Sequence, residues 1–174
     1  MRKLTTTLAL VMMMGACMNT AIAADKALPG CSDAAYRAMD FQLGDWILTD
    51  AEGKPGGHIR NTLGLGGCTV EEDYTDKGGY HGQSTSAYDA GTKTWQQYWR
   101  TNFGYTLFLH DGRREGDRLT MRGEHVDRKS GTLQQHRFTW FVGKDGKVSR
   151  QLWEISEDGT HWSARFDATY RAAK

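Results

Sequence analysis

The chain has few prolines and cysteines, and it has no large excess of charge of either sign. Its 174 residues include two prolines and three cysteines, and 22 basic side chains stand against 21 acidic ones. Affinity for nucleic acid depends heavily on clustered Lys and Arg, so a balance this close to zero gives no reason to expect such a partner. We therefore predict no nucleic-acid-binding function.

Sequence patterns for metal, nucleophilic and phosphate chemistry are also missing. There is no HExxH, His-x-His or His-x-x-x-His pattern, no Gly-x-Ser-x-Gly, and no Gly-rich loop that leads into a helix. We predict no metal, no cofactor and no catalytic residue, although the question of an enzymatic activity stays open. The histidines are scattered, and we expect each on the surface or at a rim: His58, His81, His110, His125, His136 and His161.

Only the amino terminus carries a long apolar run. Arg2 and Lys3 precede apolar residues 4–16, and residues 21–23 read Ala-Ile-Ala. This order is typical of a secretory signal, and the apolar part is too short to span a bilayer. We predict a signal peptide over residues 1–23 and, because no other run approaches membrane length, no integral membrane span.

A second interpretation of this leader stays open. Residues 14–17 read Met-Gly-Ala-Cys and resemble a bacterial lipoprotein box, which would place a lipid anchor on Cys17. The expected location is therefore outside the cytoplasm. It is periplasmic or secreted if the chain is cut after residue 23, and the outer membrane if Cys17 is acylated.

Cleavage after residue 23 leaves an even pair of cysteines, Cys31 and Cys68. Paired cysteines in an oxidising compartment favour a disulfide, whereas two buried free thiols are the alternative. Closing a loop of this length in the unfolded chain stabilises the folded state by about 3–4 kcal/mol. We predict a Cys31–Cys68 disulfide.

The rest of the chain divides into an arm, residues 24–40, and a barrel domain, residues 41–174. Ser32 can cap a short helix over residues 33–39, with acidic Asp33 in its first turn. Beyond residue 41 the hydrophobic period becomes two, which is typical of strands. The expected strands are residues 41–49, 57–65, 68–76, 80–88, 94–101, 104–110, 117–126, 132–142, 147–156 and 161–171.

Turn residues separate these runs, and Asp-Gly and Gly-Gly pairs supply the positive φ of tight hairpins. Examples are Gly66-Gly67, Asp111-Gly112, Asp145-Gly146 and Asp158-Gly159. No spacing leaves room for a crossover helix, so neighbouring strands should be antiparallel, and closure would remove both exposed edges. We predict an all-β, closed, antiparallel up-and-down barrel of about ten strands with a short N-terminal helix.

Three segments carry a resemblance to a known group. They are Phe41-x-x-Gly44-x-Trp46, Gly67-Cys68 followed by Glu71, and the long pattern Ser156-x-Asp158-Gly159-x-x-Trp162-x-x-x-Phe166-x-x-x-Tyr170. Gly44-x-Trp46 is similar to the motif that begins calycins such as lipocalins and fatty-acid-binding proteins. Together the segments resemble secreted bacterial lipocalin-like barrels of unknown function. The resemblance implies a fold and export, but no settled activity.

The resemblance also implies structural roles. Gly44 and Trp46 would lie in the first strand, which pairs with the last in calycins, and Arg171 would lie over the face of Trp46. Fatty-acid-binding proteins hold a carboxylate with Arg-x-Tyr on the last strand. Here Tyr170 has the place of that Tyr, but Ala168 stands where the Arg would be. Neutral or weakly polar ligands are therefore expected to bind better than fatty acids.

Alternation places several polar residues on strand faces that also carry Trp. The functional interpretation is an aromatic cavity with a few polar groups that orient a ligand, and the alternative is an ordinary filled core. The candidate ligand-binding residues are Gln97, Trp99, Arg137, Trp140, Gln151, Trp153 and Tyr170. Glu71 and Glu72 face opposite ways, so at most one points inward, where it could pair with Arg137 or contact a ligand.

The sequence thus favours an exported barrel that binds a small apolar or amphipathic molecule. Two other functions remain. One is a barrel enzyme, such as an isomerase, cyclase or hydrolase, with an internal Glu or His as base, and the other is an envelope structural protein with a filled interior. The sequence does not predict the identity of the ligand or the oligomeric state.

Overall fold

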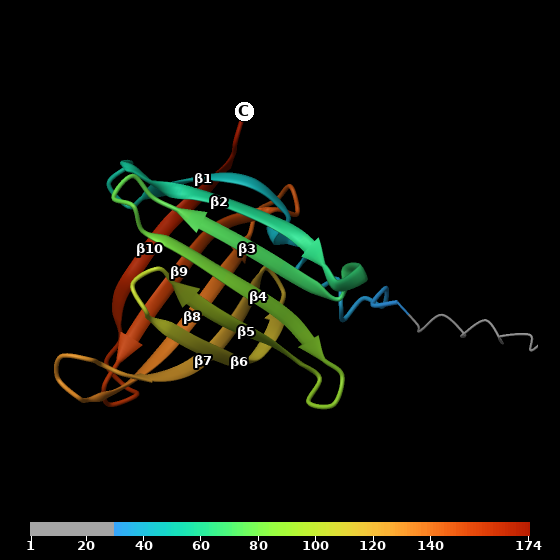
Figure 1. Ribbon diagram of the computed structural model, residues 1–174. Coiled ribbons are helices and arrows are strands. Elements are labelled where there is room, and N and C mark those ends of the chain that lie inside the picture. Colours follow the sequence, from blue (N-terminus) through green and yellow to red (C-terminus); the bar gives the residue numbers. More distant parts are fainter. Residues whose placement is uncertain (1–29) are drawn as a thin grey trace, which may run out of the picture.

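Ten antiparallel strands form one closed barrel in the computed structural model, which describes residues 30–174. The expected signal peptide over residues 1–23, with the alternative anchor at Cys17, lies outside the described residues. Each strand pairs with its neighbours in sequence, and β10 returns to pair with β1 (Figure 1). The strands are β1 (Gly44–Asp50), β2 (Pro55–Gly64), β3 (Thr69–Thr75), β4 (His81–Asp89), β5 (Thr94–Thr101), β6 (Thr106–Glu115), β7 (Arg118–Val126), β8 (Leu133–Val142), β9 (Val148–Ser156) and β10 (Ser163–Ala172).

The predicted short helix over residues 33–39 is wrong. Residues 34–39 form turns, and a three-residue 3-10 helix, η1 (Asp40–Gln42), follows them. A tertiary contact accounts for the difference, because it binds the Ala35 carbonyl, which an α-helix over residues 33–39 would use internally. The Trp95 indole donates to the Ala35 carbonyl at 3.1 Å, and Arg114 donates to the Ala38 carbonyl at 3.3 Å.

The N-terminal segment closes one end of the barrel. A disulfide joins Cys31 to Cys68, which follows the second 3-10 helix, η2 (Leu65–Gly67). Arg37 donates a hydrogen bond to the Gly67 carbonyl nearby. In Figure 1 this segment, drawn in blue, runs along the right-hand end of the barrel beside η2. The segment is thus attached to the barrel at both η2 and β5.

A packed apolar core lies behind this segment. Trp46 belongs to this core and lies on β1, which pairs with β10 to close the barrel. Trp46 on β1 is 6% exposed, and its ring centroid lies 6.2 Å from that of Tyr170 on β10. Its indole N–H donates to the Gln42 carbonyl at 2.8 Å. The other large members of the core are Met39, Phe41, Leu48, Trp95, Leu109, Leu119, Met121 and Trp140.

Arg171 does not lie over Trp46, which corrects the expected cation–aromatic contact. Arg171 pairs with Ile47, so it lies on the outer face, and its guanidinium donates to Thr49 Oγ1 at 3.4 Å. Successive residues of a strand point to opposite faces, so a residue next to inward Tyr170 cannot reach the interior. Gly44 begins β1 with φ 135°, and a Cβ there would contact the Trp46 ring at 3.2 Å.

One predicted turn is instead a bulge. Asp111-Gly112 was expected to end a strand, but β6 continues through it to Glu115. Asp111 takes φ 55°, and the pairing register shifts here against both β5 and β7. A Cβ on Gly112 would lie 2.6 Å from Trp95 Cβ, so the glycine admits close packing at the bend. An Asp-Gly pair, which is typical of a hairpin turn, therefore forms a bend within a strand here.

The opposite end of the barrel carries the β1–β2, β3–β4, β5–β6, β7–β8 and β9–β10 loops. In Figure 1 these loops lie toward the left, away from the N-terminal segment. No counterpart of the N-terminal segment covers this end within residues 30–174. Over the same residues, no helix has the length and apolar character needed to cross a membrane.

Replacing both Cys31 and Cys68 by Ser should lower the free energy of unfolding by about 3–4 kcal/mol, because the disulfide limits the freedom of the unfolded chain across a separation of 37 residues. Urea unfolding of the oxidised protein and of the double variant measures the loss. Reductant should destabilise the wild type to the same extent and leave the variant unchanged. Two reactive thiols in the denatured, unreduced protein would contradict the disulfide.

Replacing Trp46 by Ala should lower the free energy of unfolding by about 3–5 kcal/mol, since a large buried side chain leaves a cavity. The matched control is Ile47→Ala, the next residue on the outer face, which is 39% exposed. The control should cost well under half as much. Equal losses in the two variants, measured by urea unfolding, would mean that Trp46 has no special place in the closed end.

Candidate functional site

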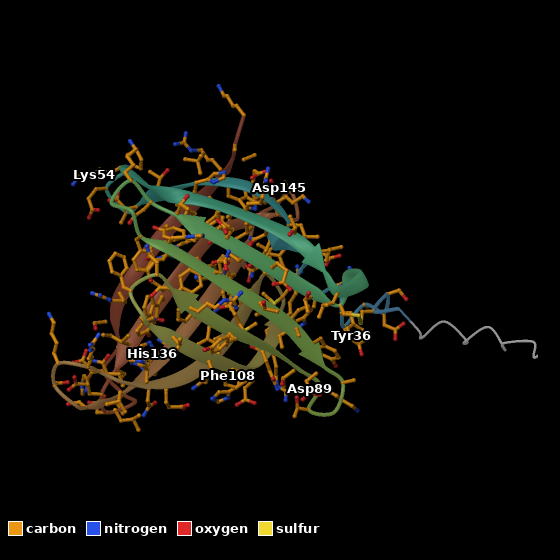
Figure 2. The ribbon with its side chains drawn as sticks, viewed as in Figure 1. Tyr36, Lys54, Asp89, Phe108, His136 and Asp145 are labelled. Atoms are coloured by element: carbon orange, nitrogen blue, oxygen red, sulfur yellow. A yellow bond between two sulfur atoms is a disulfide. The ribbon has the colours of Figure 1, made fainter. Side chains whose placement is uncertain are left out.

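The barrel encloses a cavity of about 690 Å³ that extends to the loop-bearing end. Its lining includes residues from seven strands and from the β3–β4, β5–β6 and β7–β8 loops. Figure 2 shows side chains throughout the interior, with Tyr36 at the closed end and His136 toward the other end. The size is that of a site for one small molecule.

Aromatic rings make up much of the wall, and glycines give two of them room. Tyr74 and Trp99 lie with ring centroids 6.3 Å apart. A Cβ on Gly57 would lie 2.6 Å from the Tyr74 ring, and a Cβ on Gly82 would lie 2.2 Å from the Trp99 indole. Each ring thus covers a glycine on a neighbouring strand. The other aromatic lining residues are Tyr80, Phe103, Tyr105, Phe138, Trp153 and Phe166.

Gln97 lines the cavity, and its side-chain carbonyl oxygen is the hydrogen-bonding group that it has left for a ligand. Its amide nitrogen donates to Ser84 Oγ and Ser86 Oγ, each at 3.0 Å. The two serines lie on β4 across from Gln97 on β5, and all three are buried. Because both amide hydrogens are engaged, Gln97 can only accept from a ligand.

In Gln151 on β9 the oxygen, rather than the amide nitrogen, is already engaged. Its side-chain oxygen accepts a hydrogen bond of 2.6 Å from the Tyr170 hydroxyl. This leaves its amide hydrogens as the groups that can bind a ligand. Burial, followed by the charge of Glu72, raises the pKa of Tyr170 well above its usual value, so the phenol remains a donor to Gln151.

His136 on β8 is a neutral donor in the cavity wall. Its side chain is 2% exposed, and Nδ1 accepts a hydrogen bond of 2.9 Å from the Trp153 indole. The proton of the neutral ring must then be on Nε2, which is buried and without a partner among the described residues. Burial, together with the charge of His125, lowers the pKa of His136 to about 4.

Among residues 30–174, Glu72 is the one carboxyl group in the deeper part of the wall. It lies on β3 between Val70 and Tyr74 in the inward series and is 9% exposed. Burial, followed by repulsion from Asp73, raises its pKa to about 7. None of the described residues forms an ion pair or side-chain hydrogen bond that offsets this. Desolvation without a partner disfavours a carboxylate, so Glu72 is about half protonated near neutral pH.

Charges of both signs surround the mouth. Asp76 and Asp127 contribute acidic groups, and Arg128, Lys129 and Arg165 contribute exposed basic groups. These side chains lie in or beside the loops, whereas Glu72, Gln97 and Gln151 lie along the strands. Water screens the rim charges far more than a charge inside the cavity.

The structure brings four of the seven candidate ligand-binding residues together in the cavity wall: Gln97, Trp99, Gln151 and Trp153. Tyr170 lies behind the wall and reaches it through Gln151. Trp140 is buried in the core of the closed end. Tyr170 and Trp140 are therefore not among the lining residues, and the third candidate outside the lining is Arg137.

Arg137 points outward, so the expected pair between it and an inward Glu does not form. Its neighbours His136 and Phe138 line the cavity, and alternation places Arg137 on the opposite face. There it donates to Glu154 at 2.8 Å and lies 4.2 Å from the Trp162 ring centre. The other glutamate considered, Glu71, also faces outward and accepts from Thr85 Oγ1 at 2.6 Å.

Sequence reasoning missed two polar residues of the wall. His136 was expected at the surface or rim and is instead buried. Its alternation with Phe138 and Trp140 was the available signal. The sequence analysis assigns Glu72 to neither face, although Glu72 alternates with Val70 and the aromatic Tyr74. In each case a polar residue in an apolar period-two series marked the inner wall.

Comparison with known proteins adds no family to this description. The chain matches no protein-family model and no curated protein. The closed barrel is compatible with a calycin-like fold. Within residues 30–174, no group of three or more His, Cys, Asp or Glu residues is placed to hold a metal ion.

Glu72 should make the protein less stable as the pH rises. Its pKa is about 7 when folded and about 4.5 when unfolded, so the folded state binds more protons between these values. Its contribution is fully present below the unfolded pKa and is lost as the pH passes the folded pKa, by about 3 kcal/mol in all.

The comparison with Glu72→Gln isolates this effect, because shifts at other groups, such as His136, cancel between the two proteins. The variant should gain stability relative to the wild type from about pH 5 to about pH 8, as measured by urea unfolding. The control is Glu71→Gln on the outer face, which should show no such trend. A stability difference independent of pH would show that Glu72 titrates normally.

Proposed function

We propose that the protein is an exported barrel that binds one small apolar or amphipathic molecule in its interior. The observation that carries the proposal is the cavity of about 690 Å³, sealed at one end and accessible at the other. A filled barrel would have no such space, so the cavity argues against a purely structural role. The aromatic lining favours a ligand with an apolar body.

The arrangement of polar groups supports binding with a preferred orientation. Gln97 is left with an acceptor, Gln151 with donors, and His136 with the Nε2 donor. Each of these groups is held in place by a hydrogen bond from or to another buried or half-buried side chain. Fixed polar groups of this kind orient a ligand without large losses of side-chain freedom.

Export is supported by the disulfide. Disulfides persist in oxidising compartments, and Cys31 and Cys68 are joined here. The leader over residues 1–23 is the proposed export signal, with anchoring through Cys17 as the alternative. The ten-stranded closed barrel is also compatible with the resemblance to secreted lipocalin-like proteins.

The geometry favours binding over the enzymatic alternative. A histidine base needs a free nitrogen lone pair, but Nδ1 of His136 already accepts from Trp153. Glu72 on β3 and His136 on β8 lie on strands that are not neighbours, and no hydrogen bond between them is found in the described chain. The two groups therefore do not form an acid–base pair.

Phenylbutanol, a neutral amphipathic probe, should bind with a stoichiometry of one to the cavity. Trp99→Ala removes a large aromatic contact and should weaken this binding at least about tenfold. The matched control is Trp162→Ala, which removes a Trp from the outer face, where it lies under Arg137. Isothermal titration calorimetry measures both affinities without relying on Trp fluorescence.

The control should bind phenylbutanol as the wild type does. Equal weakening by the two substitutions would place the ligand outside the cavity. Fatty acids, alcohols and aromatic compounds of increasing size then define the preferred class. Absence of saturable binding by every member of this panel, in folded protein, would refute the proposed function.

A further inference from the structure

Glu72 has no role in the hydrogen-bond network that fixes the other polar groups of the cavity. Gln97 is bound by serines, Gln151 by Tyr170, and His136 by Trp153. Glu72 faces the same cavity while nine-tenths buried, and none of the described residues offers it a cation. A buried carboxyl without a partner reduces stability, so its presence points to a ligand that pairs with it.

Strand register places Glu72 beside an aromatic pair. Glu72 pairs with Ser84, and Ser84 pairs with Trp99, so the three lie in one layer across β3, β4 and β5. The Trp99 indole occupies the space over Gly82, which pairs with Tyr74. The Trp99 and Tyr74 rings therefore meet over β4, one inward position nearer the mouth than Glu72.

The Tyr74 ring is held where it can face a ligand. Its hydroxyl donates to the Gly56 carbonyl at 2.8 Å, and the ring covers Gly57. Glu72 acts on the hydroxyls of both Tyr74 and Tyr170, whose pKa values its charge raises in addition to the larger effect of burial. Tyr74 follows Glu72 by two residues, on the same inward face of β3. A carboxyl group beside aromatic rings is the combination that binds organic cations.

We propose that the cavity selects a small organic amine with an apolar body, whose ammonium group pairs with Glu72 beneath the Tyr74 and Trp99 rings. This inference rests on the proposed binding function and names the class of ligand. The ammonium would supply the charge that Glu72 lacks, and cation–aromatic attraction would add to the pairing in a site that excludes much of the water. A neutral alcohol of the same shape would leave the carboxyl unpaired.

The charged side chains around the cavity do not take the place of a ligand's ammonium group as the partner of Glu72. Asp73, next to Glu72 on β3, faces outward and is bound by His81 at 3.0 Å and Gln83 at 2.9 Å.

Tyr74 and Tyr170 are the titratable groups that face Glu72 from β3 and β10, and both remain uncharged at neutral pH. The register partners of Glu72 on β2 and β4 are Asn61 and Ser84, which do not titrate. The basic residues Arg128, Lys129 and Arg165 are exposed at the mouth.

Pairing with an amine has a measurable proton linkage. The pKa of Glu72 is about 7, so near neutral pH about half of the molecules carry a proton there. An ammonium group beside the carboxyl favours its ionised form and lowers this pKa. Binding should therefore release roughly half a proton per ligand at about pH 7, whereas a neutral ligand should release none.

The test compares three probes on one scaffold: phenylbutylamine, phenylbutanol and phenylbutyrate. Calorimetry on the wild type should show that the amine binds at least about tenfold more tightly than the alcohol, and the alcohol more tightly than the carboxylate. In Glu72→Gln, the preference for the amine over the alcohol should fall below about twofold. Glu71→Gln makes the same change on the outer face and should retain the full preference.

Proton release, measured in buffers of different ionisation enthalpy, gives a second readout on the unmodified protein and does not depend on the folding of any variant. If the alcohol binds as tightly as the amine, with no proton released, the amine inference is wrong while the binding function stands. An amine preference that survives in folded Glu72→Gln would also overturn it. If no probe binds, the proposed function itself fails.

Discussion

Pairing of β1 with β10 is the constraint on which the rest of the structure depends. It joins Leu48 to Tyr170 and Trp46 to Ala172 in one ladder, and it removes both edges of the sheet. Once the sheet is closed, the alternation of side chains along every strand becomes a division between inside and outside. Residues such as Glu72 and His136 are buried because of this division, although nothing in their own segments removes them from water.

The two ends of the barrel are built for different purposes. At the closed end, the N-terminal segment, the disulfide and a core that contains Trp46, Trp95 and Trp140 exclude solvent. Toward the loops, the interior leaves a cavity whose walls include polar groups that lack partners. The packed end stabilises the fold, and this allows unfavourable burial at the other end, which is where ligand binding is proposed.

Glu72 and His136 are both buried polar residues of the cavity, but they favour different ligand groups. His136 has one nitrogen satisfied by Trp153, and its shifted pKa keeps the ring neutral, so its burial is partly offset. Glu72 has no such contact with any residue that the structure describes, and its pKa shift arises from desolvation and from the repulsion of Asp73. The first residue can orient a ligand as a neutral donor, whereas the second favours a ligand that brings a positive charge.

Local patterns predicted most of the fold. Period-two alternation located ten strands, because each strand has one face toward the interior, and glycine-rich turns marked most of the boundaries between them. The same turn chemistry misled at Asp111-Gly112, where packing against Trp95 makes the pair a bulge inside β6. The expected helix over residues 33–39 also failed, because Trp95, distant in sequence, binds the Ala35 carbonyl that the helix would use internally.

The candidate site was only partly accessible to such reasoning. Gln97, Trp99, Gln151 and Trp153 share strand faces with other aromatics, and the structure places all four in the cavity wall. Arg137 was chosen by the same kind of pattern but lies outside, since an arginine between two inward residues must face the solvent. Alternation identifies two faces of each strand, but it does not say which one is inside.

The sequence by itself determined that this chain forms an antiparallel barrel, because alternation and turn chemistry are local properties. It also determined that Cys31 and Cys68 could pair. Only the tertiary structure decided which face of each strand lines the cavity, which end is sealed, and which polar groups lack a partner. Those properties depend on closure, which pairs β1 with β10 and gives Glu72 and Tyr170, far apart in sequence, one common interior. The chemistry of the site therefore arises from distances between strands that no single segment encodes.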